Sequence, residues 1–130
     1  NSVLFKTEVN FIHADILNPE TKNSLGKYDV IVSNPPYVLE SDKHIMSANV
    51  LDNEPHLALF VPDVKALLFY EAIANIAVEK LNNKGVLYFE IHELKAQETV
   101  SMLKTKGFKE IEIRKDLQGK DRMVKAVWKL

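Results

Sequence analysis

The chain has 130 residues, of which 46% are hydrophobic and 27% are charged, and its formal net charge is -1. This length and composition fit one compact globular domain and exclude a disordered chain. The near-neutral charge provides no global field that would attract nucleic acid or a membrane surface. Residues 104–130 carry nine basic and four acidic side chains, which we interpret as a solvated sheet edge and helix surface.

The sequence contains no cysteine, so disulfides and thiolate metal sites are excluded. Its four histidines lack the spacing of a metal site such as HExxH, and we expect no metal. No apolar run reaches the roughly 18 residues that a membrane span needs, and no signal peptide is visible. We therefore expect a cytoplasmic protein without a membrane partner.

The first half of the chain predicts two strands and a long loop. Val9–Ala14 is largely apolar and ends at Asp15, the pattern of a strand followed by an acid. Tyr28–Ser33 is rich in β-branched residues and runs into two prolines, which cannot continue a central strand. Residues 38–64 show no clean period, so we expect a long loop with one short helix.

The second half predicts an α/β pattern that ends in a hairpin. Residues 82–85 (Asn-Asn-Lys-Gly) are expected to end the first helix, and the second helix is expected to point Leu94, Val100 and Leu103 inward. Strands that alternate with helices and then follow each other directly indicate an α/β sheet with a C-terminal antiparallel hairpin. The predicted elements are a helix over Ala66–Leu81, a strand over Val86–Ile91, a helix over Glu93–Lys106, and strands over Phe108–Arg114 and Met123–Trp128.

The most specific signal is the run Asn34-Pro35-Pro36-Tyr37 at the carboxyl end of the strand predicted over Tyr28–Ser33. In open α/β sheets, ligands bind outside the carboxyl ends of the strands. Two prolines hold the backbone extended and rigid, which fixes the side-chain carbonyl of Asn34 and the backbone carbonyl of Pro35. Both groups accept hydrogen bonds, so together they suit an –NH₂ group with two donor hydrogens.

These acceptors fit the chemistry of nitrogen methylation. An amide nitrogen is a poor nucleophile because its lone pair is delocalised. Acceptors that bind its hydrogens favour charge build-up on nitrogen and can aim the lone pair at an arriving methyl group. Tyr37 would add a flat wall for a planar amide or base. We therefore expect Asn34 and Pro35 to be catalytic; the alternative is a Pro-Pro turn after a strand.

Other candidate residues each have two interpretations. Asp15 can accept a hydrogen bond from an adenine amino group or a ribose hydroxyl, or it can serve as a helix N-cap or loop acid. Glu90 ends another predicted strand and could face the same crevice, but we interpret it as a solvated charge. Four aromatic residues are assigned to the core rather than to a ligand platform: Tyr28, Phe60, Phe69 and Trp128.

Four stretches follow the pattern of one known family, in the right order. The strand D-hydrophobic-I-V-S-N-P-P-Y is found at Asp29–Tyr37, and E-P-x-x-A-L at Glu54–Leu59. A strand that ends in E-I after a glycine matches Gly85–Ile91, and K-D-L-x-G-x-D-R-hydrophobic matches Lys115–Met123. With these stretches the chain resembles, over nearly its whole length, the HemK/PrmC family, which methylates the glutamine side-chain amide of peptide-chain release factors.

The resemblance implies a Rossmann-like class I methyltransferase fold that depends on S-adenosylmethionine, with a mostly parallel sheet and a C-terminal antiparallel hairpin. It implies a release factor as the protein substrate. Asn34–Tyr37 match the residues that bind the target glutamine, and Asn34 matches the residue beside the cofactor methyl. Asp15 and Ile16 match the stretch that lies against the adenine of the cofactor.

The sequence departs from the family pattern in two places. Phe60–Lys65 has no glycine where the family is usually glycine-rich. In the family, a glycine-rich G-x-G loop holds the methionine part of the cofactor. This chain has no G-x-G, because its four glycines are isolated: Gly26, Gly85, Gly107 and Gly119. We therefore expect residues 1–130 to be a partial, N-terminally truncated catalytic domain that lacks this loop and the first two strands. Alone, it should be inactive and bind the cofactor weakly.

In the family's sheet, the two missing strands lie between the strands that match Val9–Ala14 and Tyr28–Ser33. Their absence would leave backbone donors and acceptors unpaired on an apolar strand. We expect the isolated chain either to form an edge-paired homo-oligomer or to fold Val9–Ala14 into the gap.

Three functions remain in competition. The first is a protein-glutamine N5-methyltransferase. The second is a nucleic-acid adenine-N6 or guanine-N2 methyltransferase, because the Asn-Pro-Pro-Tyr element is shared with those enzymes; the weak net charge speaks against it. The third is a non-catalytic fragment or binding module. The absent glycine loop supports the third function for these 130 residues, but not for the parent protein.

Overall fold

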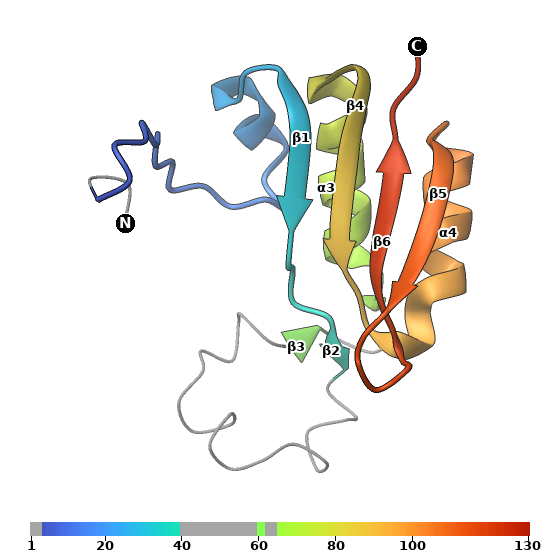
Figure 1. Ribbon diagram of the computed structural model, residues 1–130. Helices are drawn as coiled ribbons and strands as arrows, with labels where there is room; N and C mark the ends of the chain where they lie inside the picture. The colour runs from blue at the N-terminus through green and yellow to red at the C-terminus, as the bar shows by residue number, and fades with distance from the viewer. Residues whose placement is uncertain (1–3, 40–59, 62–64) are drawn as a thin grey trace.

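The computed structural model describes residues 4–39, 60–61 and 65–130. Its main sheet has four strands in the order β1-β4-β6-β5 (Figure 1). Strand β1 pairs parallel with β4, and the remaining two pairs, β4 with β6 and β5 with β6, are antiparallel. The predicted α/β sheet with a C-terminal antiparallel hairpin is therefore confirmed. The strands are β1 (Tyr28–Ser33), β4 (Leu81–Glu90), β5 (Lys109–Lys115) and β6 (Asp121–Val127).

Two helices cover one face of this sheet, as Figure 1 shows. Helix α3 (Leu68–Lys80) precedes β4, and helix α4 (Ala96–Thr105) follows it after a short 3₁₀ turn, η4 (Glu93–Lys95). The core lies between the helices and the sheet. Its fully buried side chains include Tyr70, Leu87, Phe89, Leu103, Phe108 and Val124.

Glycine is required at one close approach in the sheet. A Cβ atom on Gly85 would lie 2.9 Å from the backbone oxygen of Asn82 and 3.2 Å from that of Asp29. The register between β1 and β4 shifts nearby, between Tyr28 and Val30. Gly85 therefore lets β4 pass close to β1 at this irregular point.

Smaller elements lie near the ends of β1. A 3₁₀ turn, η1 (Pro19–Ser24), precedes β1, and the side chain of Asn18 caps it by accepting from the Glu20 backbone N–H. After the two prolines, the two-residue strand β2 (Val38–Leu39) pairs parallel with β3 (Phe60–Val61). Figure 1 places this small sheet beyond the carboxyl end of β1. The chain therefore forms two short strands within residues 38–64, where the sequence predicted a long loop with one short helix.

Three expectations about the elements were wrong. Val9–Ala14 is not a strand: it pairs with no described strand, and Phe11 is 84% exposed. Residues 82–85 do not form a turn after α3, because β4 already begins at Leu81. Leu94 does not point inward: it lies in the 3₁₀ turn before α4 and is 75% exposed. Ala96, Thr99 and Leu103 form the buried side of α4 instead.

The opposite face of the sheet and one edge are open within the described part of the chain. Strand β1 is the end strand of the sheet order, so no described strand pairs with its outer edge. Val30 and Val32 of this strand are 52% and 74% exposed, and Tyr88 and Met123 on neighbouring strands are exposed as well. The residues that follow β1 thus stand at an accessible rim of the fold.

Candidate active site

The Asn-Pro-Pro-Tyr motif directly follows β1. Because β1 and β4 are parallel, their carboxyl ends meet at one edge of the sheet, the edge at which open α/β sheets bind ligands. Asn34 is exposed, Pro35 is buried, and Pro36 and Tyr37 are half-buried. The motif is therefore packed into the fold at Pro35, whereas Asn34 is accessible to a ligand.

Asn34 lines a pocket of about 430 Å³ on the open face of the sheet. Most of its lining is apolar and comes from β1, β4 and β6, with Val32, Tyr88 and Met123 among the residues, and Arg114 and Lys125 add positive charges. Glu90, the last residue of β4, also lines it. A largely apolar hollow with a few polar groups is the usual form of a small-molecule or side-chain site.

A second pocket, of about 300 Å³, lies on the other side of the motif. Pro35 and Pro36 line it together with Ile16, which the family resemblance matched to the stretch against the adenine of a cofactor. Phe69 of α3 also lines it, although the sequence assigned this residue to the core alone. The structure thus brings Ile16 and the two prolines around one apolar hollow.

Asp15 is absent from the lining of this hollow. Its carboxylate accepts a hydrogen bond from the Leu17 backbone N–H at 2.9 Å, and its side chain is exposed. This is the loop-acid arrangement that the sequence left open as the alternative. The role of Asp15 in cofactor binding stays a prediction.

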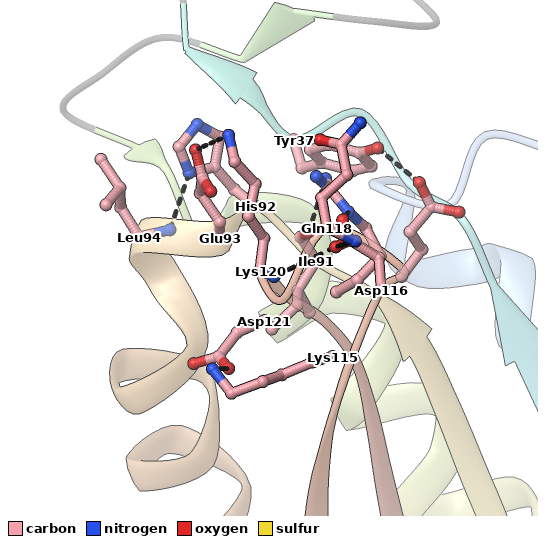
Figure 2. Close-up of polar contacts among 12 residues, drawn as sticks. Tyr37, Ile91, His92, Glu93, Leu94, Lys115, Asp116, Gln118, Lys120 and Asp121 are labelled. Atoms are coloured by element: carbon pink, nitrogen blue, oxygen red, sulfur yellow. Dashed lines mark hydrogen bonds and ion pairs between the residues drawn. The ribbon is translucent and has the colours of Figure 1, made fainter.

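Tyr37 is held by the end of β4. Its hydroxyl donates a hydrogen bond to the Glu90 carboxylate (Figure 2). Burial and this contact raise the pKa of Tyr37 from 10.0 to about 12. The Tyr37 ring meets the His92 ring edge to face, with 6.5 Å between the ring centroids. The interpretation of Glu90 as a solvated charge was wrong, because Glu90 is half-buried and accepts from Tyr37.

The turn of the C-terminal hairpin adds two charged residues to the same end of the sheet. Arg122 Nε lies 3.2 Å from Asp116 Oδ2. Asp116 Oδ1 also accepts from the backbone N–H groups of Gln118 and Lys120, at 2.9 and 3.0 Å. The bond from Lys120 is the main cause that lowers the pKa of Asp116. From the sequence alone, these residues stood out only as part of a family-like stretch.

Glu54–Leu59, another family-like stretch, and the side chain of Phe60 lie outside what the structure describes. Within residues 4–39, 60–61 and 65–130, no group of three histidine or acidic residues could hold a metal ion. No helix in those same residues has both the length and the apolar character to cross a membrane.

Comparison with known proteins gives the chain a family. The family model "Eco57I restriction-modification methylase" matches residues 1–95. The release factor glutamine methyltransferase of Flavobacterium psychrophilum is 46% identical over 97% of this chain and 44% of its own length. That of Bacteroides thetaiotaomicron is 42% identical over 97% of this chain and 45% of its own length.

A solved structure has a similar fold. It is a release-factor-specific protein-(glutamine-N5) methyltransferase from Alicyclobacillus acidocaldarius, with a TM-score of 0.51 and 22% identity. The match covers 85% of this chain and 55% of that protein. The chain spans less than half the length of the two curated relatives. With its motif, its sheet and these matches, the chain belongs to a methyltransferase family, and it is similar to the release factor glutamine methyltransferases.

Proposed function

We propose that the chain is part of the catalytic domain of an enzyme that methylates a glutamine side-chain amide in a peptide-chain release factor. The observation that carries this proposal is the position of Asn34. Asn34 directly follows β1, is exposed, and lines a pocket. The next residue, Pro35, is buried. We propose that the buried Pro35 limits the motion of Asn34, so that the Asn34 side-chain oxygen acts as a positioned acceptor.

We assign each residue of the motif a separate role in binding the target amide. The Asn34 side-chain oxygen and the Pro35 backbone oxygen would accept the two hydrogens of the target –NH₂ group. Holding both hydrogens favours the charge that develops on nitrogen and aims its lone pair in one direction. Tyr37 and Pro36 would support the planar amide from the side. No covalent intermediate is required.

The second pocket suits the adenine part of S-adenosylmethionine. Its walls of isoleucine, proline and phenylalanine side chains are apolar and fit a flat ring, with Ile16, Pro35 and Phe69 as the residues that would hold it. When bound, this cofactor supplies a methyl group activated by a positively charged sulfur. The sequence has no G-x-G to hold the methionine part, so we propose that the remaining cofactor-binding residues belong to a part of the protein outside these 130 residues.

The nucleic-acid alternative is less well supported. The name of the matching family model points to a DNA methylase, but the chain has a net charge of -1, whereas nucleic-acid enzymes usually show a basic surface. The curated relatives are named for release factors. A protein substrate in the cytoplasm is therefore the proposal.

The test is a methyl-transfer assay with the protein encoded by the complete gene and radiolabelled S-adenosylmethionine. We expect label on the glutamine of the release factor and none on DNA or RNA. Asn34→Ala should lower the rate by about a hundredfold, the effect of losing a positioned transition-state acceptor. Label on DNA, with none on the release factor, would establish the alternative instead.

A further inference from the structure

Arg122 forms the most shielded ion pair that the structure describes. The side chains of Arg122 and Asp116 are 28% and 23% exposed. In each of the other ion pairs among the described residues, at least one partner is more than 45% exposed. Exposed pairs are screened by water and contribute little to stability. The pair at Arg122 is therefore the least exposed to screening by water among the described ion pairs.

This arrangement joins the hairpin turn to the end of β4. The Arg122 backbone oxygen accepts from the Ile91 N–H at 2.9 Å, and its Nη1 lies 3.5 Å from the Ile91 oxygen. Ile91 directly follows Glu90, the residue that accepts the hydrogen bond from Tyr37. Arg122 is thus fixed by Asp116 on one side and by the β4 end on the other (Figure 2 shows Tyr37, Ile91 and Asp116 in this cluster).

The electrostatics agree with a direct effect of Arg122 on Tyr37. Charge and hydrogen bonding from Arg122 act to lower the pKa of Tyr37, against the larger effects of burial and Glu90. Burial by itself would lower the pKa of Arg122, but Asp116 and Tyr37 outweigh it and the pKa is raised.

We propose that Arg122 is a positioning residue for the methyl transfer proposed above. Asp116 and Ile91 hold Arg122 against the end of β4, where the neighbouring Glu90 accepts the hydrogen bond from the Tyr37 hydroxyl. Because Tyr37 lies three residues after Asn34, with two stiff prolines between them, a fixed Tyr37 sets the position of both acceptor oxygens. The C-terminal hairpin thereby controls the geometry of the motif.

A purely structural role for Arg122 makes a different prediction. An ion pair that only holds the hairpin would change the fraction of folded protein, but not the rate constant of each folded molecule. A positioning role lowers kcat per folded molecule with little change in KM, because it acts on the transition state.

The experiment compares three variants in the protein encoded by the complete gene, with a release factor as substrate. For Arg122→Gln we expect kcat to fall about tenfold and KM to stay within about twofold. Asp116→Asn keeps an oxygen for the turn N–H groups but loses the charge that holds Arg122, so kcat should fall about threefold. The control is Lys115→Gln, which removes a solvated ion pair, to Asp121, from the same hairpin and should leave kcat unchanged.

A second measurement does not depend on activity. The ¹³Cζ resonance of Tyr37 at neutral pH, assigned with Tyr37→Phe, reports the hydrogen bonding of its hydroxyl. We expect it to shift in Arg122→Gln and Asp116→Asn, and to stay in place in Lys115→Gln. An unchanged resonance together with an unchanged kcat in Asp116→Asn would overturn the proposal, even if Arg122→Gln does not fold.

The inference depends on the proposed function, but the two can fail separately. If the unaltered protein methylates no release factor, the proposed function is wrong. If it does, and Arg122→Gln has the same kcat and the same Tyr37 resonance, the proposed function stands and the role of Arg122 is wrong.

Discussion

The Tyr37 hydroxyl donates a hydrogen bond to the Glu90 carboxylate. This contact joins the last residue of the Asn-Pro-Pro-Tyr motif to the last residue of β4. Two parallel strands bring these residues together, although they are far apart in the sequence. The motif is therefore attached to the sheet at both of its ends, through the strand that precedes Asn34 and through the side chain of Tyr37.

The first prediction concerns this contact. Glu90→Gln removes the negative charge beside the Tyr37 hydroxyl, so the pKa of Tyr37 should fall from about 12. It should remain above the ordinary 10.0, because burial is the largest cause of the shift. A ¹³Cζ tyrosine titration measures it. Glu112→Gln on exposed β5 is the control, and an unchanged Tyr37 titration in Glu90→Gln would show that the contact is not formed.

The second prediction concerns stability in alkali. Tyr37 binds its proton more tightly in the folded state, so it contributes stability that is fully present below pH 10.0 and is lost as the pH rises to about 12. Burial raises the pKa of Tyr70 in the same direction. Urea unfolding at several pH values should show a steeper loss above pH 10.0 for the natural chain than for Tyr37→Phe.

The third prediction separates the two leucines of the α4 region. Leu103 is fully buried and Leu94 is 75% exposed. Leu103→Ala should lower the free energy of unfolding by about 2–5 kcal/mol, because it leaves a cavity in the core. Leu94→Ala should change it by less than about 0.5 kcal/mol. Equal effects in a urea titration would contradict the orientation of this helix.

The sequence predicted what is set locally. Tyr28–Ser33 is a strand with the expected bounds, and the two prolines end it, because the stiff side chains of β-branched residues and the fixed backbone angle of proline act locally. Leu94 was misassigned because the chain makes a 3₁₀ turn before α4, which shifts the buried side. Val9–Ala14 has the composition of a strand, but a strand needs a neighbour, and no described strand pairs with it.

The residues of the candidate site also fall into those that the sequence could predict and those that it could not. Asn34 and Pro35 could be found from the motif itself, because their chemistry is local to four residues. Glu90 was considered for the same crevice but interpreted as a solvated charge, and the roles of Phe69 and Arg122 could not be found, because helix packing and strand pairing bring these residues near the motif or the end of β4. Parallel pairing of the strands before Asn34 and at Glu90 was the one signal that could have placed Glu90 beside Tyr37.

The fourth prediction tests the close approach at Gly85. An added Cβ would lie 2.9 Å from a backbone oxygen, so Gly85→Ala must displace a strand and should lower stability by about 1–3 kcal/mol. Gly26→Ala is the matched control, because a Cβ there meets nothing within 4 Å. Thermal unfolding of both variants measures the difference. A Gly85→Ala protein as stable as Gly26→Ala would contradict the register shift between β1 and β4.

The last prediction concerns the open edge of β1. Its outer backbone groups pair with no described strand, and Val32 is 74% exposed. An uncovered apolar edge strand is a template for pairing with another chain. We therefore expect the 130-residue chain to self-associate as its concentration rises, in sedimentation velocity. Val32→Lys should shift it toward monomer because lysine on an edge strand opposes pairing, whereas Leu117→Lys, in the exposed hairpin turn, should not. A natural chain that stays monomeric and well folded at high concentration would show that this edge needs no partner.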